Sequence, residues 1–144
     1  MRKLIAILLI ICSCSPASEP IKYGTDECKL CNMLIMDSRF GSEAVTKKGK
    51  VFKFDSIECL VHYYLSDNIS ESEISMLLIT SYTNPNILIN AYDGFYLISK
   101  SMPSPMGEFL NGFSSKEDAI KFQVEQGGDI YNWEELLNYF KVNR

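Results

Sequence analysis

Apolar and polar residues alternate in several short runs through the middle of the chain, a period of two that is typical of half-buried β-strands. Two of these runs flank Lys48-Gly49, and a glycine in so short a turn favours a β-hairpin. Two later runs flank Asp93-Gly94, the strongest two-residue hairpin signal in the chain. The predicted strands are 43–46, 50–54, 74–81, 87–92, 95–99 and 108–113, with a loop over 66–73 and a turn over 82–86.

The apolar period lengthens to that of a helix behind two polar clusters. In the first cluster, Asp55 is the expected N-cap and Glu58 completes a capping box. In the second, Ser114 and Glu117 have the same spacing, and Gly127-Gly128 is expected to end the helix. The predicted helices are 56–65, the segment from the second box to Gly127, and 133–142.

The two halves of the chain look alike around these helix starts. Residues 54–63 and 113–122 match in register, because each has a strand end, a cap, a capping-box acid, an apolar pair and an aromatic residue. The match predicts an α+β fold of two small related β-hairpin-plus-helix units packed together, 25–81 and 82–144. Capping boxes are common, so a chance likeness is the alternative.

The N-terminus has the form of a bacterial secretory signal, with basic residues before an apolar run that is too short to span a bilayer. The run ends at a cysteine rather than at a small-x-small cleavage site, which resembles a lipobox. We therefore expect a signal peptide over 1–13, a lipid-modified Cys14 and a flexible tether over 14–24. This predicts a membrane-anchored lipoprotein of the cell envelope that faces the periplasm or extracytoplasmic side. Conventional cleavage near Ala17 is the alternative.

Charge and motif content disfavour several classes of function. The 144-residue chain has a formal net charge of −4, and its basic residues do not cluster, which disfavours nucleic-acid binding. It has one histidine and lacks the Gly-x-Ser-x-Gly and His-Glu-x-x-His motifs and a phosphate-binding loop. We therefore expect neither an enzyme nor a protein with a small-molecule substrate.

The strongest chemical signal is a run of sulfur-containing residues at the start of the first unit. Cys28, Cys31, Met33 and Met36 supply two thiols and two thioethers within nine residues. These soft donors favour Cu(I), whereas zinc and iron sites rarely include a methionine. The alternatives are that the methionines fill the core and that the Cys-x-x-Cys pair serves zinc, redox chemistry or a disulfide.

Three cysteines remain beyond the predicted lipid site, an odd number that suggests chemistry or metal binding in an oxidising compartment. Cys28 is either a ligand or a disulfide partner of Cys31. Cys59, early in the first predicted helix, is expected to be an inert core thiol, and His62 a solvated or capping imidazole. The candidates for positions near the metal but outside its direct ligands are Met36, Met102, Cys59 and His62.

Two other functions fit part of this pattern. One is a thiol–disulfide oxidoreductase that uses Cys28 and Cys31, although such pairs usually open a helix and the following residues predict none. The other is a scaffold lipoprotein in which the same pair holds zinc or a disulfide. A scaffold of this kind should not prefer Cu(I), so chelator competition separates it from a copper site.

Several motifs together resemble the NosL family, a copper-binding lipoprotein that serves nitrous oxide reductase as an accessory protein. The likeness rests on Cys28-x-x-Cys31-x-Met33, the segment 49–61, Pro105-Met106-Gly107 and Gly127-Gly128. It runs from Cys28 to about Trp133 and is weak over 66–86.

The resemblance implies an extracytoplasmic metallochaperone that binds Cu(I) and delivers it to a client copper enzyme, nitrous oxide reductase. The family pattern points to Cys31, Met33 and Met106 as ligands, with Cys28 as a further one, and the joint between the two units would hold the metal. Many members have glycine where this chain has Asn32, a residue that tolerates the left-handed backbone conformation.

Overall fold

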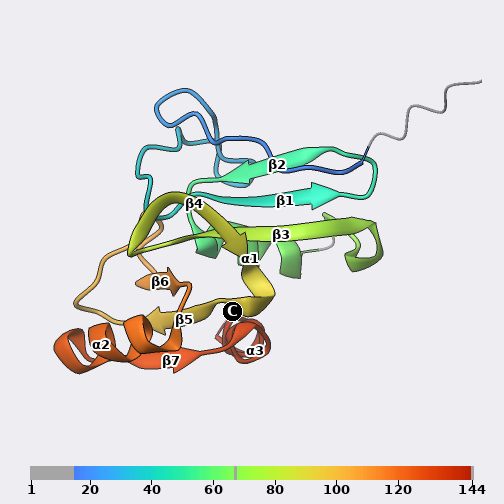
Figure 1. Cartoon of the computed structure of the whole chain (residues 1–144). Coiled ribbons are helices and arrows are strands. Elements are labelled where there is room, and N and C mark those ends of the chain that lie inside the picture. The colour runs from blue at the N-terminus through green and yellow to red at the C-terminus, as the bar shows by residue number, and fades with distance from the viewer. Residues whose placement is uncertain (1–14, 67, 144) are drawn as a thin grey trace, which may run out of the picture.

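The computed structural model describes residues 15–66 and 68–143, which form two small antiparallel β-sheets and three α-helices (Figure 1). The predicted α+β class is confirmed. The predicted signal peptide over 1–13 and the predicted lipid site at Cys14 lie outside the described residues.

The first sheet consists of β1 (Ser42–Thr46), β2 (Val51–Phe54), β3 (Ile74–Ser81) and β4 (Asn84–Asn90), in the order β2-β1-β3-β4. The predicted hairpin of β1 and β2 is confirmed, with Ser42 opposite Phe54. Its turn contains Gly49 at φ 79°, a left-handed conformation that favours glycine. The turn after β3 is shorter than predicted, because Ser81 already pairs with Asn84. The first sheet therefore extends past the expected division at residues 81 and 82.

The second sheet consists of β5 (Phe95–Ile98), β6 (Leu110–Phe113) and β7 (Asp129–Tyr131), in the order β6-β5-β7. The predicted hairpin around Asp93-Gly94 is wrong, because β4 pairs with β3 whereas β5 pairs with β6 and β7. A short 3-10 helix, Ala91–Asp93, carries the chain from one sheet to the other, and Asn90 caps it by accepting the Tyr92 N–H at 3.0 Å. Gly94 has φ −74°, not the positive φ of a tight hairpin turn.

Helix α1 (Ile57–Leu65) begins one residue later than its capping box predicts. Its N-cap is Ser56, whose hydroxyl accepts a hydrogen bond from the Cys59 N–H at 3.2 Å. This satisfies one of the amide donors that a helix start leaves free. The prediction of Asp55 as N-cap is therefore wrong, and its carboxylate is available for another role.

Helix α2 (Lys116–Gln126) repeats this arrangement in the second half. Its N-cap is Ser115, not the predicted Ser114, and the Ser115 hydroxyl accepts the Asp118 N–H at 3.1 Å. Gly127, at φ 71°, ends the helix as predicted. Both helices therefore start one residue later than predicted, so residues 54–63 and 113–122 stay in register.

Helix α1 lies at the junction of the two sheets, since it contacts β1 and β2 on one side and β6 and the last helix, α3 (Trp133–Val142), on the other (Figure 1). One large cluster of buried side chains includes residues of both sheets. In it the indole of Trp133 packs against the rings of Tyr64, Tyr92 and Tyr96. The first turn of α1 is buried as a result, which matters for the thiol that it carries.

Among the described residues, no helix is long and apolar enough to cross a bilayer.

Candidate metal site

The Cys-x-x-Cys segment forms a tight loop that leads into β1 from the N-terminal side. The Cys28 N–H donates to the Met33 carbonyl at 2.8 Å, and the Asn32 N–H donates to the Cys28 carbonyl at 3.0 Å. Asn32 has φ 60°, so the residue expected to tolerate the left-handed region does occupy it. An isolated bridge between Glu27 and Leu34 closes the base of the loop. These hydrogen bonds and this bridge give the loop a defined shape.

Two contacts hold this loop against strand β2. The Lys29 N–H donates to the Lys53 carbonyl at 2.8 Å. The Lys53 ammonium also pairs with the Asp26 carboxylate at 2.8 Å, and this pair is largely shielded from solvent. Because β2 leads directly into α1, docking the loop here brings its cysteines to the helix start.

Four potential metal ligands converge at this point. The sulfur atoms of Cys28, Cys31 and Cys59 and a carboxylate oxygen of Asp55 all lie within 4.8 Å of one another. Cys28 and Cys59 are fully buried, Asp55 is 4% exposed, and Cys31 is half-buried. Two ligands come from the loop, one from the residue that follows β2 and one from the first turn of α1.

Hydrogen bonds within the cluster distinguish the three thiols. The Cys59 thiol donates to the Cys28 sulfur and, against the effect of burial, lowers the Cys28 pKa to about 6, with help from the backbone N–H groups of Cys31, Asp55 and Leu30. The pKa of Cys59 is raised, first by this same hydrogen bond and then by burial. Burial also raises the pKa of Cys31. The hydrogen bonds and burial within the cluster therefore favour the thiolate form at Cys28 over that at Cys59 and Cys31.

The carboxylate of Asp55 has one oxygen, Oδ1, that is buried and has no hydrogen-bond partner among the described residues. Burying an unpaired carboxylate oxygen costs on the order of several kcal/mol, as for other polar groups moved from water into an apolar interior, unless a donor or a cation compensates it. Three sulfur atoms that can each bind a soft cation lie within 4.8 Å of a carboxylate oxygen of the same residue. The cluster therefore has the composition of a metal site.

A protein-family model of NosL matches residues 21–139, which is most of the chain. The chain belongs to the NosL family. A curated relative, the copper-binding lipoprotein NosL of Stutzerimonas stutzeri, is 24% identical over 125 residues. The match covers 82% of this chain and 66% of that protein, so the chain spans just under two thirds of the relative's length.

The crystal structure of the copper chaperone NosL from Shewanella denitrificans has the same fold, with a TM-score of 0.72 and 30% identity. The match covers 83% of this chain and 94% of that chain. One relative is named a copper-binding lipoprotein and the other a copper chaperone, and neither name states an enzymatic activity. This agrees with the expectation that the chain is not an enzyme.

The four ligands that the sequence and the NosL resemblance predict occupy two kinds of environment. Cys28 and Cys31 are in the cluster. Met33 and Met106 are surface residues, with 49% and 37% of their area exposed. Met33 follows Cys31 by two residues on the same loop, and its side chain is exposed whereas Cys28 is buried and Cys31 half-buried. Met36 is more exposed still, at 68%.

The loop that carries Met106 is fastened to helix α1. The Ser104 hydroxyl donates to the Glu58 carboxylate, next to Cys59 in the first turn. At the other end of the loop, Glu108 accepts from the ring of His62 at 2.9 Å. The loop therefore lies along α1, the helix that contributes Cys59 to the cluster.

The remaining predicted neighbours of the metal have other contacts. The ring of His62 pairs with Glu108 and packs edge-on against Phe140, which makes it a support for the methionine-bearing loop. Met102 is buried in a smaller core cluster beside Leu97 and Phe113. Neither contact involves the three sulfur atoms of the cysteine cluster.

The sequence predicts Asp55 as a helix cap, which is wrong, because Ser56 is the N-cap. For Cys59 the sequence predicts a buried core thiol and a candidate position near the metal. Cys59 is buried as expected, but its sulfur joins the loop thiols. The spacing Asp55-x-x-x-Cys59 at a helix start, paired with an upstream Cys-x-x-Cys, is the signal that would have revealed both.

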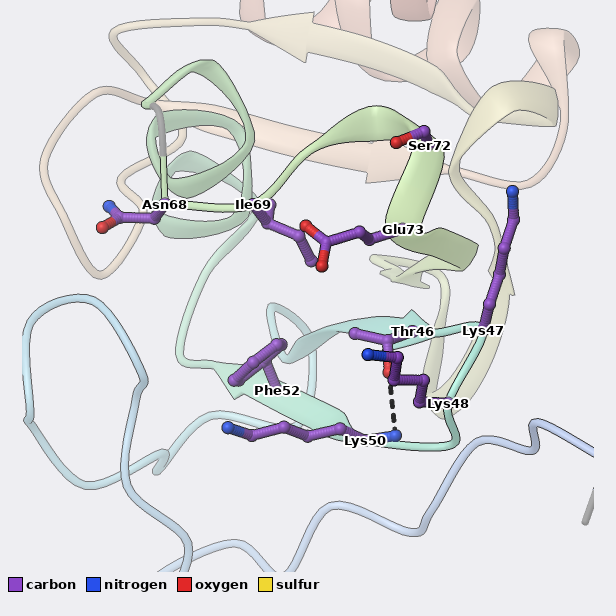
Figure 2. Close-up of a pocket in the computed structure, with 9 residues that line it drawn as sticks. All are labelled: Thr46, Lys47, Lys48, Lys50, Phe52, Asn68, Ile69, Ser72 and Glu73. Atoms are coloured by element: carbon purple, nitrogen blue, oxygen red, sulfur yellow. Dashed lines mark hydrogen bonds between the residues drawn. The ribbon is translucent and has the colours of Figure 1, made fainter.

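A separate pocket of 440 Å³ lies at the turn end of the first hairpin (Figure 2). Figure 2 shows Phe52 forming one wall beside Lys48 and Lys50, with Ile69 and Glu73 facing them from the segment before β3. None of the cluster residues lines this pocket. It lies at the opposite end of the hairpin from the point where β2 enters α1, and so it is not part of the metal site.

Proposed function

We propose that this protein is a Cu(I)-binding metallochaperone, anchored to a membrane through a lipid on Cys14, that delivers copper to a copper enzyme, nitrous oxide reductase. The observation that carries the proposal is the Cys-x-x-Cys loop. It turns the sulfurs of Cys28 and Cys31 into a thiol cluster while it leaves the Met33 thioether at the surface. The proposed ligands are Cys28, Cys31, Met33 and Met106.

The donor types suit a metal that must be released. Cu(I) accepts two or three soft ligands, so thiolates and thioethers bind it without completing a rigid shell. Because the thioethers of Met33 and Met106 are exposed, a ligand of the client can bind the metal before the buried thiolates dissociate from it. A thioether also forms no disulfide, so it remains a donor in an oxidising compartment.

The structure disfavours a thiol–disulfide oxidoreductase. Such an enzyme needs an accessible thiolate that can attack a substrate disulfide. Here Cys28, the thiol with the lowered pKa, is 1% exposed, whereas the more accessible Cys31 has a raised pKa. The pair also lies in a turn and not at a helix N-terminus.

Two further parts of the proposal rest on the relatives. The name of the Stutzerimonas relative describes a lipoprotein, which supports an extracytoplasmic, membrane-anchored location and a lipid on Cys14. The choice of nitrous oxide reductase as client follows from the family resemblance. The surface position of the two thioethers is what a hand-over to a folded partner requires.

Copper binding is tested by anaerobic titration of the reduced protein against a chromophoric Cu(I) chelator. We expect Met33→Ala and Met106→Ala each to weaken Cu(I) binding by about ten-fold or more, the size of one lost soft ligand. Met76→Ala, which removes a half-buried thioether in β3, is the control and should keep the parent affinity. Unchanged affinity in both ligand variants would remove the shared site.

Anchoring is tested by fractionating cells that express the full chain. Cys14→Ala should move the protein into the soluble fraction, whereas Cys12→Ala should leave it with the membranes. Membrane retention of the Cys14→Ala variant would contradict the predicted lipid site. The client is tested by the copper content of nitrous oxide reductase purified from cells that lack this protein, which should fall and recover when the gene is restored.

A further inference from the structure

A small patch of positive charge lies at the turn of the first hairpin, on a chain that is acidic overall. It consists of Lys47, Lys48 and Lys50, which we call the lysine turn and which line the pocket of Figure 2. We propose that the lysine turn binds the anionic phospholipid headgroups of the membrane that anchors the chain, and so fixes how the domain faces that membrane. This inference rests on the anchoring part of the proposed function. The patch is too small for a nucleic-acid site, which needs basic residues along a whole face.

The charges of the lysine turn are not neutralised within the fold. All three residues are exposed, and none of them forms an ion pair with another described residue. Lys53 of the same hairpin is the contrast, because it pairs with Asp26 at 2.8 Å and is largely shielded from solvent. One carboxylate lines the pocket, that of Glu73, and it accepts the Ser70 N–H at 3.2 Å. The turn therefore keeps a surplus of positive charge for an external anion.

The 440 Å³ pocket beside the turn combines apolar and cationic surfaces. The Phe52 ring forms one wall, with the Lys50 ammonium 4.7 Å and the Lys29 ammonium 6.0 Å from its centroid. Folding thus adds a fourth lysine, from the Cys-x-x-Cys loop, to the patch. Ile69 supplies a second apolar surface, and the Thr46 hydroxyl, which accepts the Lys50 N–H at 2.9 Å, can donate to an anion. A phospholipid headgroup matches this combination, because its phosphate is charged and its glycerol and first acyl carbons are less polar.

The N-terminal segment approaches the lysine turn as it is followed back toward Ser15. Ile21 lies beside Gly41, just before β1. Two residues earlier in the chain, the Glu19 N–H donates to the Glu43 carboxylate at 3.4 Å, further along β1 toward the turn. Ser15 lies four residues before Glu19, and the same number of residues separates Glu43 from the lysine turn, so an extended segment reaches the turn. Figure 1 shows this segment passing along the hairpin to its turn end.

This path places the proposed anchor next to the patch. Cys14 directly precedes Ser15 in the sequence, so acyl chains on it would enter the bilayer close to the lysine turn. Each lysine near an anionic surface strengthens membrane binding by about five-fold. Because the acyl chains already hold the protein at the membrane, the lysines act mainly on its orientation.

The orientation has a consequence for the cysteine cluster. Strand β2 leads from the lysine turn to Asp55, a distance of roughly 17 Å for five residues of extended chain. With the turn against the headgroups, the other end of the hairpin is raised from the bilayer by up to this distance. The docked domain therefore presents its cysteine cluster to a client and not to the lipid.

Amine labelling of the full chain tests this docking. The protein is purified from cells with its native N-terminus and reconstituted on vesicles of phosphatidylcholine, either alone or with phosphatidylglycerol. A water-soluble acylating reagent labels the lysines, and mass spectrometry gives the rate at each position. We expect the lysine turn and Lys29 to react at least about five-fold more slowly on the anionic vesicles. The exposed Lys116 and Lys121 of α2 are internal controls and should react equally on both. Salt at about 1 M should abolish the difference, because it shortens the Debye length to about 3 Å.

Matched triple variants test whether the charges of the turn are the cause. One variant replaces the three lysines of the turn, as Lys47→Gln, Lys48→Gln and Lys50→Gln. The other removes three exposed lysines of α2 and α3, as Lys116→Gln, Lys121→Gln and Lys141→Gln. Lys29 is kept in both and reports the docking. Its labelling on the anionic vesicles should become as fast as on neutral ones in the first variant and should stay slow in the second. Circular dichroism checks folding, and both variants should bind Cu(I) like the parent, since none of these lysines belongs to the cluster.

The outcomes separate the docking from the anchor and from other anions. The same spectra contain the N-terminal peptide, so its mass shows whether Cys14 is acylated. An acylated Cys14 with equal labelling on the two vesicles would overturn the docking, leave the anchor and free the patch for an acidic protein partner. An unmodified Cys14 with slow labelling on the anionic vesicles would remove the anchor and support the docking. Glycerol 3-phosphate is added to the neutral vesicles as a further arm. If it slowed the same lysines as strongly as the anionic lipid does, the pocket would bind a soluble phosphate and the membrane docking would be overturned.

Discussion

The two halves of the molecule contain the same frame of strand, serine cap and helix, but the frame has a different role in each half. In each half a strand ends at a buried phenylalanine, Phe54 or Phe113, and a serine two residues later caps the helix. The first helix start contributes a carboxylate and a thiol to the metal cluster. The second helix start faces outward, and Ala119 is the buried residue of its helix.

The difference lies in what covers each helix. Most of the first two turns of α1 are buried, because the helix lies between two sheets and beneath the Cys-x-x-Cys loop. At the second junction, Asp118 occupies the position that matches Cys59, and it accepts a hydrogen bond from the Thr83 hydroxyl at 3.2 Å. A helix start therefore becomes a metal site where a second segment with suitable donors is folded over it, and the frame alone is not sufficient.

The largest expected effect comes from truncating the phenylalanine at each junction. Phe54→Ala and Phe113→Ala should each lower the free energy of unfolding by about 3–5 kcal/mol, because each removes a fully buried ring and leaves a cavity. Phe54 packs on Tyr63 in the large core cluster, next to Asp55, whereas Phe113 packs on Phe122 in the small one. Urea unfolding measures the stability. Titration with Co(II), a spectroscopic probe of metal binding by the cysteine cluster, measures the site under native conditions.

The two substitutions should separate in the titration. Phe54→Ala is expected to weaken Co(II) binding, and Phe113→Ala to leave it unchanged. If both weakened it to the same extent, the junctions would be coupled through the core and the contrast between them would not hold.

A change of pH is expected to have a smaller effect on the free energy of unfolding, and this effect comes from a residue of the first half. Glu43 in β1 is fully buried, and burial raises its pKa to about 7 from an ordinary value of 4.5. In the second sheet, the fully buried polar residue Asn111 does not titrate. A raised carboxyl pKa stabilises the fold below the ordinary value, and that stability is lost as the pH rises through about 7.

Glu43→Gln isolates this contribution. The wild type should lose on the order of 3 kcal/mol relative to the Glu43→Gln variant between pH 4 and pH 8, since each unit of pKa shift corresponds to about 1.4 kcal/mol. Urea unfolding of both proteins across this range gives the difference, in which the other acids cancel. Parallel curves would show that Glu43 ionises normally in the folded state.

The helix caps allow a finer comparison of the two junctions. Ser56→Ala and Ser115→Ala each remove one N-cap hydrogen bond, which costs about 0.5–2 kcal/mol. Ser56 is fully buried and its amide partner belongs to Cys59, whereas Ser115 is half-buried. We expect the larger loss of stability at Ser56, together with a weaker Co(II) affinity that Ser115→Ala does not share. Equal losses with no change in the metal affinity would mean that the cap does not position the Cys59 thiol.

The sequence was sufficient for much of the fold because its signals are local. The β1–β2 hairpin, the three helices and the match between 54–63 and 113–122 follow from hydrophobic period, turn residues and caps. The hairpin predicted at Asp93-Gly94 failed because a dipeptide does not reveal that the chain changes sheets there. Contacts between distant residues decide which strand pairs with which, and a short stretch of sequence does not contain that information.

The metal cluster shows the same limit. The loop thiols Cys28 and Cys31 are recognisable by their spacing, but the roles of Asp55 and Cys59 depend on how the loop folds over α1. Each of these two residues has an ordinary local explanation, as a cap and as a core thiol. Only the arrangement in space places both beside the loop thiols.

The smallest effect is expected from a pair of substitutions that copies the donors of the site to the start of the second helix. Ser114→Asp and Asp118→Cys together give the second helix start the same carboxylate and thiol spacing as the first. We expect no tetrahedral Co(II) binding at the new position, because the described structure places no Cys-x-x-Cys loop over α2. The double variant is made in the Cys59→Ser background and compared with Cys59→Ser alone, so that a tetrahedral Co(II) spectrum gained over that parent comes from the copied donors. The stability should change by less than about 1 kcal/mol, since Asp118 loses one partly exposed hydrogen bond to Thr83. A tetrahedral Co(II) signal restored by these two substitutions would show that the strand, cap and helix frame is sufficient for a metal site, and that the covering loop is dispensable.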